Sequence, residues 1–296
     1  MLNTHVAPKV SIIMPTYNRA AYILETIESI RDQTHQNWEL IIIDDGSNDN
    51  TVEIVEELKD DRIHIYKAGR IGLISQVRKI GIEKATAGFI ALADSDDLWG
   101  VTKLAEQVLA LQQYPEAGFC LTGGYNFQVK GVPIDFFYTQ TAGINYGNLF
   151  ISFFKSQLSG YSQALLFRTE CMDISPFKET DSDVDFITRL ARNFNGVILY
   201  KPLLFRRIHD TNFSQSNWRR SYYKGINVIY SNRQYVPATI VRDALFNLYV
   251  NFGEDCILNK EPKNAMVNFL KAWTNKPLSI TPLKKTGKVL LHYFKR

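Results

Sequence analysis

The first part of the chain alternates between short apolar runs and segments with helical periodicity. Strands are predicted at Val10–Met14, Glu39–Asp44, Arg62–Lys67 and Phe89–Ala93, and helices at about 22–33, 50–58, 75–85 and 102–113. Strands buried on both faces read as continuous apolar runs, and their alternation with helices implies parallel crossover connections. The pattern therefore predicts an α/β fold with a mostly parallel, Rossmann-like sheet flanked by helices.

The second part of the chain loses this regular alternation. Short strands with glycine-rich breaks are predicted from Gly118 to about Val132, helices at Tyr146–Lys155 and about Asp183–Arg192, and a strand at Val197–Arg206. After Asn217 the helical pattern is broken at Pro237, Pro262, Pro277 and Pro282. We expect one domain at 1–216, with parts at about 8–115 and 116–216, and a helical C-terminal extension at 217–296.

Composition narrows the class of protein. The chain is 45% hydrophobic and 22% charged, as folded globular proteins are, and its net charge of +4 includes no dense basic stripe interleaved with aromatics. We therefore expect no nucleic-acid partner. Three widely spaced cysteines argue against a disulfide framework or a zinc site. With no signal-peptide core and no apolar run of about 18 residues, we expect a cytoplasmic protein without a spanning helix.

Polar side chains follow three of the predicted strands at the point where each strand ends. They lie in Pro15–Asn18, Asp44–Asp49 and Asp94–Asp97. Ligands bind at the carboxyl ends of strands in open parallel sheets, although turn and cap chemistry alone also explains the first two clusters. Three carboxylates in Asp94–Asp97 repel one another unless a cation neutralises them. This cluster predicts a metal ion or a cationic ligand.

The three clusters, in their order and spacing, resemble glycosyltransferase family 2, which has the GT-A fold. The matching stretches read Val-Ser-Ile-Ile-Met-Pro-Thr-Tyr-Asn-Arg, then Ile-Ile-Ile-Asp-Asp-Gly-Ser-Asn-Asp, then Ala-Asp-Ser-Asp-Asp, and the likeness covers about residues 8–215. The resemblance implies an inverting enzyme that moves a sugar from a nucleotide sugar, of the uridine diphosphate class, to a carbohydrate hydroxyl. It also implies a setting in bacterial surface polysaccharide synthesis, with a saccharide or glycolipid acceptor.

The resemblance also assigns donor-binding residues in the part at 8–115. These are Pro15, Thr16, Tyr17, Asp44, Asp45, Arg78, Asp94 and Ser95. Thr16 and Tyr17 are expected to line the base, and the acidic pair after the second strand to hydrogen-bond it. Arg78 is expected to help hold the nucleotide, although Lys79 stands where the family commonly has asparagine. Asp94 is expected near the ribose.

A divalent metal, Mn²⁺ or Mg²⁺, is the implied cofactor. Asp96 is its expected ligand, His209 is expected to approach the metal or the diphosphate, and Asp97 is a further candidate that could instead support the ribose. His209 stands in Arg-Ile-His-Asp-Thr-Asn-Phe-Ser, which resembles the family's Arg-x-His-x-x-Asn-x-Ser stretch. A diphosphate leaves readily only when its charge is neutralised, and oxygen ligands suit both ions.

The catalytic base is assigned to the part at 116–216. The stretch from Ser182 to Leu190 resembles the family segment that carries this base at a helix start, which places the base at Asp183. Asp181 is the fallback if the register differs. The alternative is structural, since acids at the start of a helix cap it and interact with its positive end.

Two further features have two readings each. Trp99, just beyond the acidic cluster, could stack on an acceptor sugar or belong to the core. The tail at 283–296 carries five lysines and arginines and no acid, so it could contact an anionic membrane surface or pack on the protein itself.

Other functions fit the sequence less well. The main alternative is a non-catalytic nucleotide-sugar-binding protein of the same fold, against which the presence of Asp96, Asp183 and His209 argues. A dinucleotide-dependent oxidoreductase or a nucleotidyltransferase would need a glycine-rich turn after the first strand. Met-Pro-Thr-Tyr-Asn, at residues 14–18, has no glycine.

Overall fold

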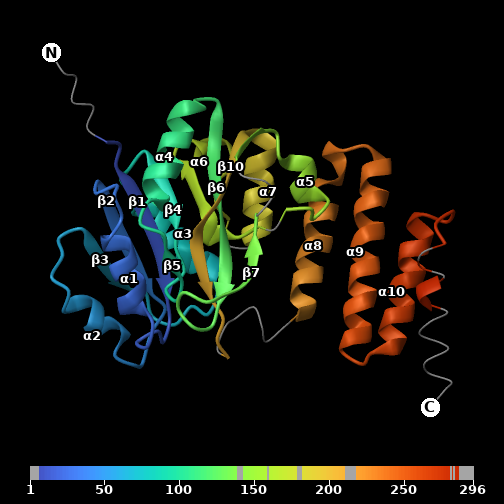
Figure 1. Cartoon of the computed structure of the whole chain (residues 1–296), viewed down its shortest axis with the longest axis horizontal. Coiled ribbons are helices and arrows are strands. Elements are labelled where there is room, and N and C mark those ends of the chain that lie inside the picture. The colour runs from blue at the N-terminus through green and yellow to red at the C-terminus, as the bar shows by residue number, and fades with distance from the viewer. Residues whose placement is uncertain are drawn as a thin grey trace. The chain divides into compact units, whose positions relative to one another are not determined.

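The structure is a computed structural model and describes residues 7–138, 143–158, 160–178, 182–210, 218–280, 282 and 284–286. The chain divides into two compact units. The first comprises the residues up to 149 together with 160–210, and the second comprises 150–159 together with the residues from 211 onward. Figure 1 shows the elements of both units.

One mixed sheet forms the first unit. Its first four strands in space, β3 (Ile63–Lys67), β2 (Trp38–Asp44), β1 (Val10–Thr16) and β4 (Phe89–Leu92), are parallel. The sheet continues through β9 (Leu165–Arg168), β6 (Ala117–Phe127), β10 (Asn195–Arg207) and β5 (Leu98–Trp99). Of these added pairs only β6 with β10 is parallel, and β7 (Pro133–Phe137) and β8 (Ile144–Gly147) pair antiparallel with β6 and β10.

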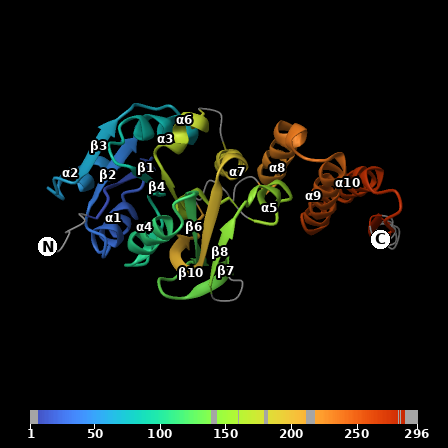
Figure 2. The ribbon, with the colours of Figure 1, turned by 90° about the horizontal axis from the view of Figure 1, so that it is seen from above.

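Helices cover both faces of this sheet. They are α1 (Ile23–Arg31), α2 (Thr51–Glu56), α3 (Ile74–Glu83), α4 (Lys103–Gln113), the short α6 (Cys171–Ile174) and α7 (Asp183–Asn193), with a 3-10 turn at Ser162–Ala164. Figure 2 shows α1 and α4 on one face and α3 and α7 on the other. The predicted α/β class is confirmed, and each of the four predicted strands and helices of residues 8–115 is present within about two residues of its predicted ends.

The predicted helix at Tyr146–Lys155 is wrong in its first half. Residues 144–147 form the edge strand β8, paired with β10, and helix α5 covers only Phe150–Phe154. Gly147 ends the strand with φ +146°, a conformation that other residues rarely adopt. The apolar periodicity of residues 144–155 is compatible with a helix or with a strand. Residues 144–147 form a strand because they pair with the edge of β10.

Helix α3 lies unusually close to the sheet because of Gly81. A Cβ at this position would stand 2.5 Å from Ile13 Cγ2 on β1 and 3.2 Å from Ile43 Cγ1 on β2. Both strands are buried along their whole length, so the helix fits against a rigid surface. This close packing fixes the height of α3 above the carboxyl ends of β1 and β2, and with it the position of Arg78.

The second unit is helical among its described residues. It contains α5, α8 (Trp218–Asn232), a 3-10 turn (Arg233–Tyr235), α9 (Ala238–Leu258) and α10 (Pro262–Asn275). The starts of α9 and α10 follow or include the predicted proline breaks. Phe252, Cys256, Ala265 and Phe269 form the core between α9 and α10. Among the described residues, none of the helices has both the length and the apolar content that a bilayer crossing requires.

The tail singled out in the sequence falls mostly outside the described residues. Of 283–296 only residues 284–286 are described, and Lys285 forms an ion pair with Glu254 of α9. Membrane contact through 283–296 therefore stays a prediction, as does the assignment of 217–296 as a separate extension.

A buried lysine lies inside the first unit. The Lys103 side chain is fully buried, its ammonium donates to Gln107 Oε1 at 2.9 Å, and its Nζ lies 3.9 Å from the centroid of the Trp99 ring. Burial lowers the pKa of Lys103 to about 7. In an unfolded chain the pKa of a lysine is about 10.4, as in model peptides. Above about pH 7 the unfolded chain therefore binds a proton that the folded chain does not.

Replacing Lys103 should change how stability depends on pH. In the native protein this residue makes the free energy of unfolding rise between about pH 7 and about pH 9, by at most about 1.4 kcal/mol per unit, because protons favour the unfolded state there. Lys103→Met should flatten that rise in urea unfolding followed by circular dichroism. Lys59→Met, at an exposed lysine, is the control and should keep the native slope. Equal slopes for Lys103→Met and the native protein would contradict the prediction.

Candidate active site

A buried arginine joins three parts of the first unit. Arg78 projects from α3 and is 1% exposed. Its Nη2 donates to Asp94 Oδ1 at 2.6 Å, and its Nη1 donates to Asp183 Oδ1. Asp94 follows β4, and Asp183 is the first residue of α7. The single guanidinium thus connects α3, the end of β4 and the start of α7, and brings together residues more than 100 positions apart.

The cap of α7 is made by other residues than Asp183. Ser182 is the N-cap, and its Oγ accepts from the Asp185 backbone N–H at 3.3 Å. The Asp185 carboxylate accepts in return from the Ser182 backbone N–H at 3.2 Å, which completes a capping box. Asp183 is therefore not needed as the cap, and its carboxylate faces Arg78. Asp181, the fallback base, lies outside the described residues.

The three carboxylates after β4 point to different partners. Burial raises the pKa of the Asp94 carboxyl, and the Arg78 charge opposes that rise. Burial, with the charges of Asp96 and Asp94, raises the pKa of Asp97 well above its usual value. Asp97 is 2% exposed, and both of its oxygens accept hydrogen bonds, from Gln163 Nε2 at 3.2 Å and from the Arg207 backbone N–H at 2.9 Å. Asp97 is thus occupied in joining β10 to the acidic cluster.

Asp96 faces two basic side chains. Its Oδ2 accepts from Arg19 Nε at 3.1 Å and lies 3.1 Å from His209 Nε2. The His209 ring stacks on Tyr22, with centroids 4.5 Å apart. The structure therefore brings together Asp96 and His209, the two residues that the sequence pairs as metal ligands. The described residues contain no group of three or more His, Cys, Asp or Glu side chains placed to hold a metal by themselves.

Arg19 was missed by the sequence reasoning. It is the last residue of the first matching stretch, where it looks like an ordinary helix-start residue. Besides Asp96, its guanidinium donates to the carbonyls of Tyr17 and Asn18 at 3.2 and 3.1 Å. The signal that could have found it is the acidic cluster itself, because three adjacent carboxylates require cations from elsewhere in the chain.

A second group of side chains gathers at the end of β2. Asp45 accepts from the Arg70 guanidinium and from the Gly72 backbone N–H at 3.2 Å. The Arg70 guanidinium carbon lies 3.8 Å from the centroid of the Tyr17 ring. Asp44 accepts from the backbone N–H groups of Gly46 and Ser47 at 3.2 and 3.1 Å, which shapes the turn. Of the two predicted base-binding carboxylates, Asp44 is thus committed to the turn and Asp45 to Arg70.

The remaining predicted donor residues are buried beside this group. Pro15 lies within β1 opposite Ile43, and Ser95 is 5% exposed. Thr16, the last residue of β1, is 3% exposed, and its buried hydroxyl has no hydrogen-bond partner among the described residues. That hydroxyl is an unsatisfied group at the strand end where the sequence predicts the nucleotide.

Trp99 does not line the site. It is 3% exposed in β5, and its ring packs against the buried Lys103 ammonium. A ring enclosed in this way offers no face to a sugar, so the expected acceptor contact is corrected in favour of the core.

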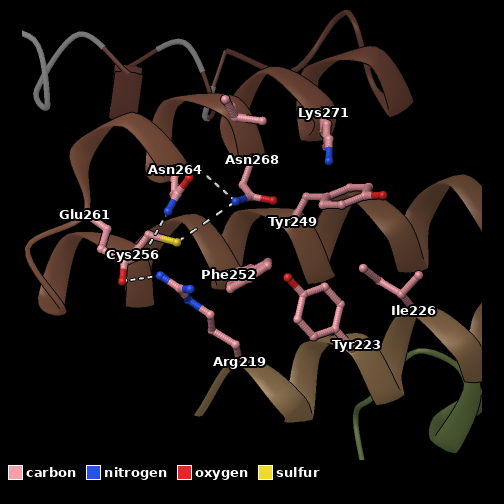
Figure 3. A pocket seen from close by; sticks show the side chains of 11 residues that line it. Arg219, Tyr223, Ile226, Tyr249, Phe252, Cys256, Glu261, Asn264, Asn268 and Lys271 are labelled. Atoms are coloured by element: carbon pink, nitrogen blue, oxygen red, sulfur yellow. Dashed lines mark hydrogen bonds and ion pairs between the residues drawn. The ribbon is translucent and has the colours of Figure 1, made fainter. Parts of the chain in front are cut away.

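The second unit contains a pocket of about 270 Å³ between α8, α9 and α10 (Figure 3). Tyr223, Tyr249 and Phe252 line it with Asn268 and Lys271. Its polar groups largely satisfy one another. Glu261 pairs with Arg219 and accepts from Asn264 Nδ2 at 2.9 Å, and Asn268 Nδ2 donates to the Asn264 carbonyl at 2.8 Å. These bonds tie α10 to α8 and to its own first turn.

A family model and two named proteins similar to this chain describe glycosyltransferases. Residues 11–164 match the model of the family described as glycosyl transferase family 2. The Bacillus subtilis protein named putative teichuronic acid biosynthesis glycosyltransferase TuaG is 29% identical over 73% of this chain and 85% of its own length. The Escherichia coli UDP-Glc:alpha-D-GlcNAc-diphosphoundecaprenol beta-1,3-glucosyltransferase WfgD is 43% identical over 33% of this chain and 39% of its own.

Solved structures resemble the whole chain in fold. Staphylococcus aureus TarS, residues 1–349, aligns with a TM-score of 0.65 at 19% identity, over 95% of this chain and 88% of that one. The Pyrobaculum calidifontis mannosyltransferase PcManGT, in complex with GDP-Man and Mn²⁺, aligns with a TM-score of 0.61 at 18% identity, over 96% and 80%. Asp183 and His209 lie beyond the residues that the family model matches.

Removing the Arg78 guanidinium should destabilise the first unit. Arg78→Met leaves Asp94 and Asp183 without their shared cation. The loss should be about 3 kcal/mol, the low end for a broken buried pair because both carboxylates retain some contact with water. Lys67→Met, which breaks an exposed pair with Glu56, is the control and should cost less than about 1 kcal/mol. Guanidinium unfolding measures both, and similar midpoints for the two variants would refute the bridging role of Arg78.

Proposed function

The chain belongs to glycosyltransferase family 2, and on that premise we propose that it is an inverting transferase with Asp183 as its catalytic base. The observation that carries the proposal is the position of Asp183. Its carboxylate is released from capping by Ser182 and Asp185, and it shares the Arg78 guanidinium with Asp94 of the acidic cluster. A base oriented in this way, apart from the carboxylate paired with His209, is what a single displacement requires.

The donor is proposed to be a uridine diphosphate sugar bound at the ends of β1, β2 and β4. Arg70 over the Tyr17 ring and the carboxylate of Asp45 form a planar, polar surface suited to a base, and Thr16 has a free hydroxyl nearby in sequence. The E. coli relative is named for UDP-Glc, and TarS has been solved with UDP and with UDP-GlcNAc. These names support the donor class and leave the sugar open.

A divalent ion, Mn²⁺ or Mg²⁺, fits the pair formed by Asp96 and His209. They offer one carboxylate oxygen and one imidazole nitrogen, and phosphate oxygens and water commonly complete the shell of such ions. When bound, the ion supplies positive charge that stabilises the departing diphosphate. Arg19, on the same carboxylate oxygen, holds Asp96 in place. The Mn²⁺ in the PcManGT complex supports this choice.

In the proposed displacement, the chain's own residues move one proton and hold the base in position. Asp183 accepts the proton of the acceptor hydroxyl as the oxygen forms its bond to the anomeric carbon, and the bond from that carbon to the diphosphate oxygen breaks on the opposite face. Arg78 keeps the Asp183 carboxylate oriented toward the donor throughout. Configuration inverts, so an α-linked donor gives a β-linked product. The β-1,3 linkage in the name of the E. coli relative supports this outcome.

The acceptor is proposed to be a saccharide or glycolipid in bacterial surface polysaccharide synthesis. The names of the Bacillus and E. coli relatives describe teichuronic acid and a diphosphoundecaprenol-linked sugar. We assign catalysis to residues 1–216, with the donor in 8–115 and the acceptor in 116–216, and place the protein in the cytoplasm at the inner face of the membrane. The alternative of a non-catalytic nucleotide-sugar-binding protein predicts donor binding without hydrolysis or transfer.

Asp183→Asn tests the base. Asparagine keeps the size of the side chain and can still accept from Arg78, so folding and UDP binding should persist. Transfer should fall at least about a hundredfold, the lower end for loss of a general base. Asp185→Asn, in the capping box of the same helix, is the matched control and should act mainly on stability. Turnover measured with a panel of nucleotide sugars, together with thermal unfolding, separates the two effects.

Two outcomes would change the assignment. Near-native turnover of Asp183→Asn together with an inactive Asp181→Asn would move the base to Asp181. Activity in all three variants would place the base outside this segment and remove the main support for the proposed mechanism.

Asp96→Ala tests the metal. The variant loses a ligand of the proposed site, so UDP should bind in Mn²⁺ with at least about tenfold lower affinity. Because Asp96 also pairs with Arg19 and His209, thermal unfolding of the variant is measured alongside, to separate loss of the metal from loss of the fold. Calorimetric titration of UDP with and without Mn²⁺ measures the loss. Asp173→Ala, at an exposed acid on α6, should bind as the native protein does. Full transferase activity in EDTA would rule out the metal role.

A further inference from the structure

Helix α10 carries an exposed face that has no partner among the described residues. Its buried side, Ala265, Asn268, Phe269 and Ala272, packs toward α9. On the opposite side Val267 and Leu270 are each 49% exposed and Trp273 is 36% exposed, at the three-residue spacing that aligns side chains along a helix. The segment that follows exposes Leu278 almost fully, at 99%, and Ile280 at 59%. We call Val267, Leu270, Trp273, Leu278 and Ile280 the outer face.

Only positive charges accompany the outer face. Lys263 and Lys271 are the lysines of α10, and both are exposed. Lys271 stands with Val267 at the margin of the face, where both also line the pocket between α8, α9 and α10. No Asp or Glu occurs anywhere in residues 262–296. The neighbouring acids Glu261, Asp243 and Glu254 are each engaged in an ion pair, with Arg219, Lys276 and Lys285. Apolar side chains between lysines, with a tryptophan among them, are the pattern of helices that lie in the surface of an anionic bilayer.

We propose that the outer face of α10 docks on an anionic phospholipid bilayer. The apolar side chains would enter the boundary between head groups and acyl chains, while Lys263 and Lys271 meet lipid phosphates. A second copy of the chain fits less well, since a symmetric contact would set these lysines against their own copies. The described residues of the face carry this proposal independently of the tail at 287–296, and vesicle binding needs neither donor nor acceptor.

The test uses the full chain and co-sedimentation with vesicles of phosphatidylcholine, alone or mixed with phosphatidylglycerol. The native protein should partition onto the anionic vesicles, and less so as salt is raised. Val267→Glu with Leu270→Glu should lower the partition coefficient at least about tenfold, and so should Lys263→Glu with Lys271→Glu. The matched control, Val101→Glu with Leu109→Glu at residues 55% and 61% exposed on and before α4, should partition as the native protein does.

Three results would overturn the proposal. The native protein could fail to bind anionic vesicles. Val267→Glu with Leu270→Glu could bind as well as its control, which would assign any binding to another part of the chain. The same variant could convert a native dimer to a monomer in light scattering with unchanged vesicle binding, which would make the face a contact between copies. Circular dichroism checks that each variant folds, as substitutions at half-exposed positions should allow.

Discussion

The buried guanidinium of Arg78 is the interaction on which the candidate active site depends. A charge removed from water requires partners, and the two partners here are carboxylates from distant parts of the chain, Asp94 and Asp183. Because Gly81 brings α3 close to β1 and β2, the arginine reaches the carboxyl edge of the sheet from a fixed height. The start of α7 is thereby tied to the end of β4. The same bridge orients the Asp183 carboxylate toward the acidic cluster.

The acidic cluster after β4 is stable for a reason that the sequence does not reveal. Its carboxylates do not share one counter-charge. Asp94 pairs with Arg78, and Asp96 pairs with Arg19 and His209. Asp97 accepts hydrogen bonds from Gln163 and from the backbone N–H of Arg207. Protein groups therefore relieve part of the repulsion that suggested a metal, while burial and the charges of Asp96 and Asp94 still raise the pKa of Asp97. The argument for a metal rests instead on Asp96 and His209, which bring an oxygen and a nitrogen to within 3.1 Å of each other.

The two compact units divide the chemistry of the protein. The first unit contains every residue assigned to donor binding and catalysis. The parallel half of its sheet supplies the strand ends. Asp183, at the start of α7, and His209, just after β10, come from the later part of the unit. The second is a set of helices around Phe252, Cys256, Ala265 and Phe269, and its outer face on α10 pairs apolar exposure with positive charge. The family model matches residues 11–164, most of which lie in the first unit, and the proposed docking face belongs to the second.

The sequence by itself determined the α/β class, the strands and helices of residues 8–115, and the three polar clusters at the strand ends. These features depend on periodicity and on residues adjacent in the chain, which local physics governs. It could not determine that residues 144–147 pair as a strand, that Trp99 is enclosed with Lys103, or that Arg19 and Arg78 supply the cations of the site. Those outcomes depend on partners brought together only by folding, such as Arg78 and Asp183 at 105 positions apart. Burial makes an unpaired charge unfavourable, so a buried charged side chain is found beside an opposite charge. Which residue supplies that opposite charge depends on the tertiary structure and not on distance along the chain.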